Sequence, residues 1–422
     1  MTVSTPTLPD PATTPKSAST PMSAGLVVVI LAMLLGIQPI TTDLYLPALP
    51  AMTSSFSARM SQAQLTLSAV LLAFGVSQMI WGPLSDRFGR RPILLCGLAA
   101  YVLAAMGSVM APGMLQLIVW RTVQGAAMGA VVMGARAMVR DLYQPQDGAR
   151  IMSKGLSGLG ALACISAPTG GLLAEFYGWR AALMAVAVFG AATLVLVALR
   201  FKETLPGKNL QALQPAMLLT TWRKILSNPT FLAFSALSIA SYGGLFTFLA
   251  SSSFVLITVL GLSKAQFGMV MFCTSLSYVM GTFVCRRLLR RYSVQQTVAI
   301  AAVVSLCAGT LMGALAWLDV LSVWAVVGPL ALFMVGHGIH QPCGQSGAVG
   351  PFPQAAGAAS AMNGFLMMVV AFAIGSWLGT RLDGTVLPLT NGMWFWSIMI
   401  AISAWTLVRK YGHSPVRLAD TL

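Results

Sequence analysis

Apolar residues fall along this chain in long blocks separated by short polar segments. An α-helix needs ~20 apolar residues to cross the hydrocarbon core of a bilayer. Most of the blocks reach or exceed that length, which is long for the buried helices of a soluble protein. They predict twelve membrane-spanning helices near residues 25–49, 63–84, 92–111, 113–136, 151–173, 179–200, 229–257, 265–285, 294–316, 321–345, 357–380 and 388–409.

Composition supports a membrane protein. Hydrophobic residues make up 57% of the chain and charged residues only 8%, whereas an ordinary globular domain carries about 25% charged residues. So few charges cannot cover a surface that faces water. We therefore expect an all-α integral membrane protein whose outer surface is solvated by the lipid bilayer.

The net charge of +15 would suggest nucleic acid as a partner if the chain were soluble. Its placement favours another interpretation. With a cytoplasmic N-terminus, 20 of the 25 Lys and Arg residues fall in segments on the inside and four in segments on the outside, while Arg121 lies within a span. Basic loops stay on the cytoplasmic side of membranes. We therefore expect both termini in the cytoplasm and no nucleic-acid partner.

The longest polar stretch after the N-terminal tail divides six spans from six. We expect a disordered cytoplasmic tail over 1–24, a six-helix bundle over 25–200, a cytoplasmic central loop over 201–228, a second bundle over 229–409 and a cytoplasmic tail over 410–422. Six-span repeats of this kind are one known plan for transporters, in which the substrate site lies between the halves near mid-membrane.

The loop after span 2 carries the most specific motif. It contains Gly82, Asp86, Arg87, Gly89, Arg90 and Arg91 in the order Gly-x-Leu-x-Asp-Arg-x-Gly-Arg-Arg. The glycines permit a tight turn and close backbone approach, and the aspartate can pair with the arginines around it. The motif resembles the signature loop of the major facilitator superfamily. The resemblance implies two pseudo-symmetric six-helix bundles, and a loop that acts as a conformational latch between spans 2 and 11.

Arg121 lies inside span 4, in the run Leu117-x-x-x-Arg121-x-x-Gln124-Gly125. A guanidinium within a span costs several kcal/mol, ~2.5–3.5 on insertion scales, so it needs a partner or a water-filled cavity. Backbone carbonyls could neutralise it in a purely structural role. The run also resembles the span-4 motif of the superfamily's proton-coupled exporters, which implies a role for Arg121 in proton transfer.

Asp43 is the only acidic residue well inside the twelve blocks. At ~1.5 Å of rise per residue, it and Arg121 lie at depths that differ by less than the reach of an arginine side chain. We therefore expect the two to pair and to couple transport to protons. The alternative is that Asp43 caps a helix end near the headgroups, since Pro47 and Pro50 follow closely.

Three further runs, at 42–50, 140–143 and 351–364, resemble the bicyclomycin-resistance (Bcr/CflA) group of twelve-span drug/proton antiporters. Span 5 departs from the antiporter pattern. Span 5 carries Ser166 and Ala167 where Gly-Pro is expected, with the proline displaced to Pro168. This departure weakens the inference of antiport, because the motif shapes the contact between spans 5 and 8.

Span 10 holds His337, His340, Gln341 and Gln345 roughly along one helix face. The stripe could line a wet cavity or could be a polar packing surface between helices. A carboxylate or thiolate that would complete a metal site is missing, so we expect neither metal nor cofactor. We expect a central cavity between spans 1, 2, 4, 5, 7, 8, 10 and 11, with candidate lining residues Gln38, Thr42, Gln124, Tyr242, Tyr278, His337 and Gln341.

These observations lead to one hypothesis and two alternatives. The hypothesis is a monomeric transporter of the bacterial inner membrane that exports small amphipathic drugs in exchange for protons, by alternating access. The first alternative is an importer or metabolite exporter of the same fold. The second is a membrane-embedded enzyme.

Overall fold

The computed structural model describes residues 22–143, 145–205, 207, 214–382 and 384–412. Within this part of the chain all regular structure is helical, and twelve helical segments are long and apolar enough to cross a membrane. Each of the twelve predicted spans overlaps one of these segments. Several helices run about a turn past their apolar block, because the helical ladder still satisfies backbone hydrogen bonds there.

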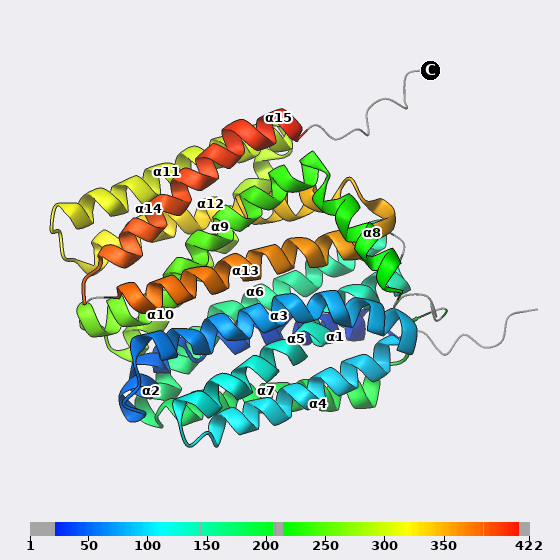
Figure 1. The fold of residues 1–422 in the computed structure, drawn as a ribbon, viewed down its shortest axis with the longest axis horizontal. Coiled ribbons are helices and arrows are strands. Elements are labelled where there is room, and N and C mark those ends of the chain that lie inside the picture. Colours follow the sequence, from blue (N-terminus) through cyan, green and yellow to red (C-terminus); the bar gives the residue numbers. More distant parts are fainter. Residues whose placement is uncertain (1–21, 144, 206, 208–213, 383, 413–422) are drawn as a thin grey trace, which may run out of the picture.

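The first six spans form one bundle, drawn in blue to green in Figure 1. Its elements are α1 (Ala24–Asp43), η1 (Leu46–Ala48), α2 (Leu49–Ser55), α3 (Met60–Phe88), α4 (Arg90–Val109), α5 (Met114–Leu142), α6 (Pro145–Phe176) and α7 (Trp179–Arg200). The first three of these together make span 1.

The last six spans form the second bundle, drawn in green to red in Figure 1. Its elements are α9 (Pro229–Ser253), η2 (Phe254–Val259), α10 (Lys264–Leu288), α11 (Val294–Trp317), α12 (Val323–Val349), η3 (Pro353–Ala355), α13 (Ala356–Arg381), α14 (Leu387–Ile402), η4 (Ser403–Val408) and α15 (Arg409–Tyr411).

A helix, α8 (Pro215–Leu226), lies between the bundles where the sequence predicted a loop. Proline at its first position suits a helix start, Ile225 is fully buried, and the helix packs against α9 and α13. We call the end of the molecule that carries α8 the linker end, and the other the opposite end. The expected terminal tails fall mostly on 1–21 and 413–422, which lie outside the described residues.

The outer surface is apolar. Leu103, Val188 and Leu199 are 68%, 60% and 74% exposed, and many other large apolar side chains face outward in the same way. Such a surface is stable against hydrocarbon and would be an aggregation hazard in water. The chain is therefore a multi-pass membrane protein.

The two bundles meet along two seams, where α3 packs on α13 and α6 packs on α10. Figure 1 shows the first of these pairs, with blue α3 beside orange α13. At the opposite end the second seam is closed, because Lys264 Nζ donates to Ala174 O at 3.0 Å and Ala265 N donates to Glu175 Oε2 at 2.9 Å. Nearer the linker end, a Cβ placed on Gly160 would meet no described atom within 4 Å.

Candidate functional site: the cavity between the bundles

A cavity of about 270 Å³ lies between the bundles. Its walls come from α1, α3, α5 and α6 of the first bundle and from α9, α10, α12 and α13 of the second. These are spans 1, 2, 4, 5, 7, 8, 10 and 11, the eight expected from the sequence. The apolar wall includes aromatic and methionine side chains, namely Phe74, Phe248, Met271, Met334, Met367 and Met368.

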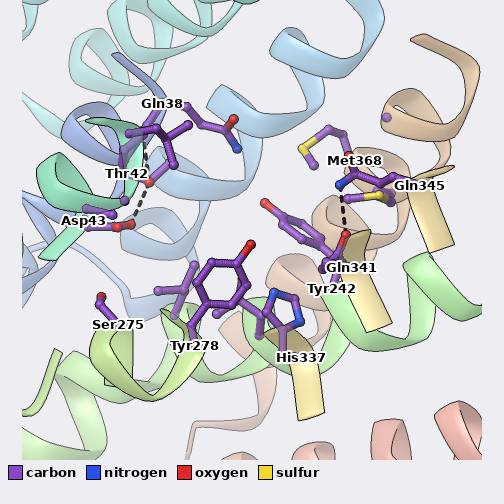
Figure 2. A pocket seen from close by; sticks show the side chains of 18 of the residues that line it. Gln38, Thr42, Asp43, Tyr242, Ser275, Tyr278, His337, Gln341, Gln345 and Met368 are labelled. Atoms are coloured by element: carbon purple, nitrogen blue, oxygen red, sulfur yellow. Dashed lines mark hydrogen bonds between the residues drawn. The ribbon is translucent and has the colours of Figure 1, made fainter. Parts of the chain in front are cut away.

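Asp43 is the last residue of α1 and lines this cavity. The chain turns from α1 into η1 just after it, so the carboxylate stands at a helix end rather than within a regular turn. Thr42 Oγ1 donates to Asp43 Oδ1 at 2.7 Å. Figure 2 shows Asp43, Thr42 and Gln38 together on one side of the cavity. On the other side lie Tyr242 of α9, Tyr278 of α10, and Gln341 and Gln345 of α12.

Arg121 is fully buried in α5 and does not line the cavity. Its Nη2 donates to Thr41 O at 2.8 Å, its Nη1 donates to Gln124 Oε1 at 2.8 Å, and its guanidinium lies 4.1 Å from the centre of the Tyr45 ring. The expected ion pair with Asp43 is not formed, since no described carboxylate lies within 4.0 Å of Arg121. A carbonyl, an amide and an aromatic face solvate this cation instead.

Six of the seven expected lining residues do line the cavity: Gln38, Thr42, Tyr242, Tyr278, His337 and Gln341. The exception is Gln124, which is 1% exposed and binds Arg121. It packs inside the first bundle because its amide solvates the buried guanidinium.

The polar stripe of α12 divides between two environments. His337 lines the cavity, where its Nδ1 lies 2.8 Å from Ser241 Oγ and its ring centre lies 5.5 Å from that of Tyr278. Gln341 donates to Ser238 O at 3.1 Å and accepts from Gln345 at 3.0 Å. His340 instead turns away from the cavity to α11, with Nε2 3.2 Å from Ser305 Oγ. Of the two alternatives for this stripe, the cavity lining applies to His337, Gln341 and Gln345, and the packing surface between helices applies to His340.

The signature loop lies at the linker end, and Arg90 is its centre. Arg90 is 2% exposed and binds Asp86 and Asp141, each at 2.7 Å, as well as Ser85 Oγ. Arg140 lies 3.9 Å from Asp86. These partners all belong to the first bundle, so the ionic contacts of Asp86 do not cross to span 11 in this conformation. Arg140 does contact span 11, since a Cβ on Gly357 of α13 would lie 3.1 Å from Arg140 Nη1.

The rest of the loop is held by a residue that the sequence did not single out. Glu203, just after α7, accepts hydrogen bonds from the backbone N–H groups of Arg90 at 2.9 Å and Arg91 at 3.1 Å. It thus caps the N-terminus of α4, where backbone N–H groups lack helical partners. Gly89 has a φ of +111°, and a Cβ there would lie 2.7 Å from Glu203 Oε2. Of the remaining loop residues, Gly82 packs near Met133, and Arg87 lies 5.6 Å from the Phe88 ring.

The span-5 motif on α6 packs closely against neighbouring backbone. Gly170 approaches the backbone of Leu44, and Gly171 approaches the backbone of Lys264 on α10. The displaced Pro168 lies against Gly268, so that a Cβ on Gly268 would be 2.8 Å from Pro168 Cα. The altered motif therefore still lies at the contact between spans 5 and 8.

The polar lining residues that the sequence did not predict include Arg136 on α5, Gln78 on α3 and Asn363 on α13. The predicted span 113–136 ends at Arg136, because an arginine that closes an apolar block usually marks the cytoplasmic side of the membrane. The helix in fact continues to Leu142, which leaves Arg136 on a cavity wall. The signal that could have revealed this was the helix-favouring run Ala135 to Val139.

Comparison with known proteins agrees with this fold and cavity. Residues 31–376 match the family model of the Major Facilitator Superfamily, so the chain belongs to that family and is a transporter rather than an enzyme. Among its relatives is "Multidrug resistance protein D" of Escherichia coli (strain K12), 30% identical over 81% of this chain and 85% of that protein.

Two further relatives have names of the same kind. The "Bicyclomycin resistance protein homolog" of Haemophilus influenzae is 25% identical over 86% of this chain and 91% of that protein. The "Chloramphenicol resistance protein" of Pseudomonas aeruginosa is 26% identical over 79% of each chain. Among solved structures, a D-xylose-proton symporter superposes with a TM-score of 0.70 over 93% of this chain at 13% identity, which is a likeness of fold.

Proposed function

We propose that this transporter exports small amphipathic drugs from the cytoplasm of a bacterium in exchange for protons, working as a monomer in the inner membrane. The observation that carries the proposal is the position of Asp43. It lines the cavity between the bundles, where a proton and a drug can compete for the same space. The names of the relatives support the drug as cargo.

The character of the cavity wall suits such cargo. Ligand pockets gain most of their affinity from apolar and aromatic side chains and fix orientation with a few polar groups. Phe74, Phe248 and four methionines supply the first kind of contact here. Methionine is flexible and polarisable, which lets one wall adapt to ligands of different shape.

The contacts between α6 and α10 support a cytoplasm-facing state. This seam is closed by hydrogen bonds at the opposite end, whereas Gly160, midway along α6, faces the cavity with no described atom within 4 Å of a Cβ placed on it. If the basic linker end is cytoplasmic, as charge placement predicts, this conformation would admit a drug from inside the cell.

Substituting Asp43 by Asn tests the proposal. The carboxamide keeps the shape and the Thr42 contact but cannot carry a proton, so drug efflux driven by a pH gradient should fall to the background of empty proteoliposomes. Binding of the same drug to purified protein should change by less than about 3-fold. Asp147→Asn, at an exposed ion pair with Arg150, is the matched control. Undiminished pH-driven efflux by Asp43→Asn would remove Asp43 from the coupling mechanism.

Direction of transport separates this proposal from an importer or metabolite exporter of the same fold. Inside-out vesicles that acidify their lumen should accumulate the drug in exchange for protons. Loss of drug from preloaded vesicles under the same gradient would instead establish symport.

A further inference from the structure

Arg136 is a charged residue of the cavity that the proposed proton coupling does not use. It lies on α5 about 9 Å from the linker end of that helix, at ~1.5 Å per residue. Its side chain lines the cavity. The hydrogen bond that the structure gives it runs across the bundle interface, from Nη1 to Ser360 Oγ of α13 at 3.3 Å. A guanidinium has five N–H donors, so most of them are not engaged by the protein.

No described carboxylate lies within 4.0 Å of Arg136. The carboxylates near the linker end have other partners: Asp86 and Asp141 bind Arg90, and Glu203 caps α4. Arg136 differs in this from Arg90, which has two carboxylates. It differs also from Arg121, whose solvating groups bury it away from the cavity. The positive charge of Arg136 therefore faces the space that a ligand enters.

Polar groups with unused hydrogen-bonding capacity share this part of the wall. Asn363 is one helical turn beyond Ser360 on α13, and residues at this spacing share a helix face. It is 3% exposed, its Oδ1 has no partner, and its Nδ2 contacts only Met367 Sδ, at 3.8 Å. Gln78 reaches the same turn from α3, since a Cβ on Gly364 would lie 3.6 Å from its amide. Arg136, Asn363 and Gln78 form what we call the Arg136 cluster.

The cluster lies well away from Asp43. Asp43 is ~28 Å from the linker end of α1 by helix rise, against ~9 Å for Arg136 on α5. The cavity thus has a carboxylate toward one end, a guanidinium toward the other, and an apolar and aromatic wall between them.

We propose that the Arg136 cluster binds the acidic group of the exported compound, so that the cavity prefers amphipathic compounds that carry a carboxylate. This deepens the proposed drug export and rests on it for the identification of the ligand as cargo. The planar fork of guanidinium fits a carboxylate through two parallel hydrogen bonds. Asn363 Nδ2, which contacts Met367 Sδ at 3.8 Å, and Gln78 Nε2, which donates to Phe74 O at 3.4 Å, are the amide groups that can donate further hydrogen bonds to the carboxylate. The apolar body of the compound lies against the methionines.

The test is equilibrium binding of a matched probe pair, nalidixic acid and its uncharged methyl ester, to purified full-length protein without any proton gradient. The wild type should bind the acid at least about 10-fold more tightly than the ester. Arg136→Gln should weaken binding of the acid by about 10- to 100-fold, the range expected for losing charged hydrogen bonds. The affinity of this variant for the ester should stay within about 2-fold of the wild-type affinity, which also shows that the variant is folded.

Three controls sharpen the result. Arg150→Gln removes an exposed arginine of the same charge and should leave the preference intact. Arg136→Lys should keep part of it, because an ammonium retains the charge without the fork. Ser360→Ala should keep it fully. If Ser360→Ala abolishes the preference as Arg136→Gln does, Arg136 only holds α13 in place and the proposal fails.

Equal wild-type affinity for acid and ester, or no binding of the acid, would also overturn the proposal. These outcomes are independent of coupling. A protein that binds the acid through Arg136 yet shows no proton-driven efflux of any drug would leave this inference standing and remove the proposed function. A protein that shows proton-driven drug efflux but does not bind the acid through Arg136 would leave the proposed function standing and remove this inference.

Discussion

The two arginines that α5 carries in its apolar part are stabilised in different ways. Arg121 is closed off from the cavity and solvated by the Thr41 carbonyl, the Gln124 amide and the Tyr45 ring. Arg136 faces the cavity, with one hydrogen bond to the other bundle. Burial of a cation needs partners for its charge and its N–H groups. For Arg121 the protein provides two hydrogen-bond acceptors and an aromatic face, although its buried Nε has no partner, whereas Arg136 makes one hydrogen bond and leaves room for a ligand.

Arg121→Lys should therefore impair transport. An ammonium is a compact point charge and cannot reach Thr41 O and Gln124 Oε1 together while stacking on Tyr45. We expect at least a ~10-fold lower drug flux in proteoliposomes, on the scale of lost charged hydrogen bonds. Arg150→Lys, at an exposed site, should leave flux unchanged. Full flux in Arg121→Lys would mean that any buried cation suffices at this position.

The contacts of Arg121 also show what sequence can and cannot give at this scale. Depth in the membrane follows from residue counting, and it placed Asp43 within reach of Arg121. Rotation about the helix axis does not follow from the count. Successive residues on a helix are ~100° apart, so the carbonyl of Thr41 can face α5 while Asp43 faces the cavity. The rotational orientation of α12 is likewise not readable from the sequence, and it directs His340 toward α11 rather than toward the cavity.

At the scale of elements, the twelve spans were predictable because a membrane leaves few choices. Every backbone polar group must be satisfied within the spanning segment, so each apolar block becomes a helix. The helix α8 was not predicted, because its stability comes from packing Ile225 under α9 and α13 rather than from a long apolar block. The cap on α4 was also missed, since Glu203 and Arg90 are 113 residues apart.

Glu203 allows a prediction about pH. Partial burial would raise the pKa of its carboxyl, but four backbone N–H groups, those of Leu205, Arg90, Arg91 and Thr204, outweigh this and hold the pKa below its usual value. A lowered pKa means that stabilisation is present above the unfolded-state pKa of ~4.3 and is lost as pH falls through the folded-state pKa.

Glu203→Gln should accordingly destabilise the protein at pH 7 by ~1 kcal/mol, the scale of a helix cap. The difference from the wild type should shrink as pH falls below the unfolded-state pKa of ~4.3 and through the folded-state pKa, because the wild-type carboxyl then also becomes neutral. Thermal unfolding of the detergent-purified protein at pH 7 and over a series of acidic pH values measures this. Asp147→Asn serves as the control, since its ion pair is exposed. A difference that persists unchanged at low pH would show that the cap acts through shape and not charge.

At the scale of the whole molecule, the first question is orientation. The basic linker end is predicted to face the cytoplasm because translocating basic loops is unfavourable. In a background without the six cysteines, Ser57→Cys at the opposite end should react with an impermeant thiol reagent in intact cells. Ser227→Cys, between α8 and α9, should react only after the membrane is opened. Both residues are exposed. Labelling of Ser227→Cys from outside would invert the topology and the proposed direction of export.

The last prediction concerns coupling between charge movement and export, and it follows from how few carboxylates reach the cavity. Among the described residues, Asp43 is the carboxylate that lines it. If one proton enters through Asp43 for each drug that leaves, export of a neutral drug moves one positive charge inward. Membrane potential should then drive that export by ~2.3 kcal/mol per 100 mV.

Export of a monovalent cationic drug by the same exchange moves no net charge, so potential alone should leave its flux nearly unchanged. The measurement is flux in proteoliposomes with a potential, negative on the side of the linker end, and no pH gradient. Empty liposomes give the background for the membrane-permeant cation. A strong response of the cationic drug would require a second proton per cycle. His337 would then be the first residue to test, because it lines the cavity beside Tyr278 and its substitution by Gln should restore the one-proton behaviour.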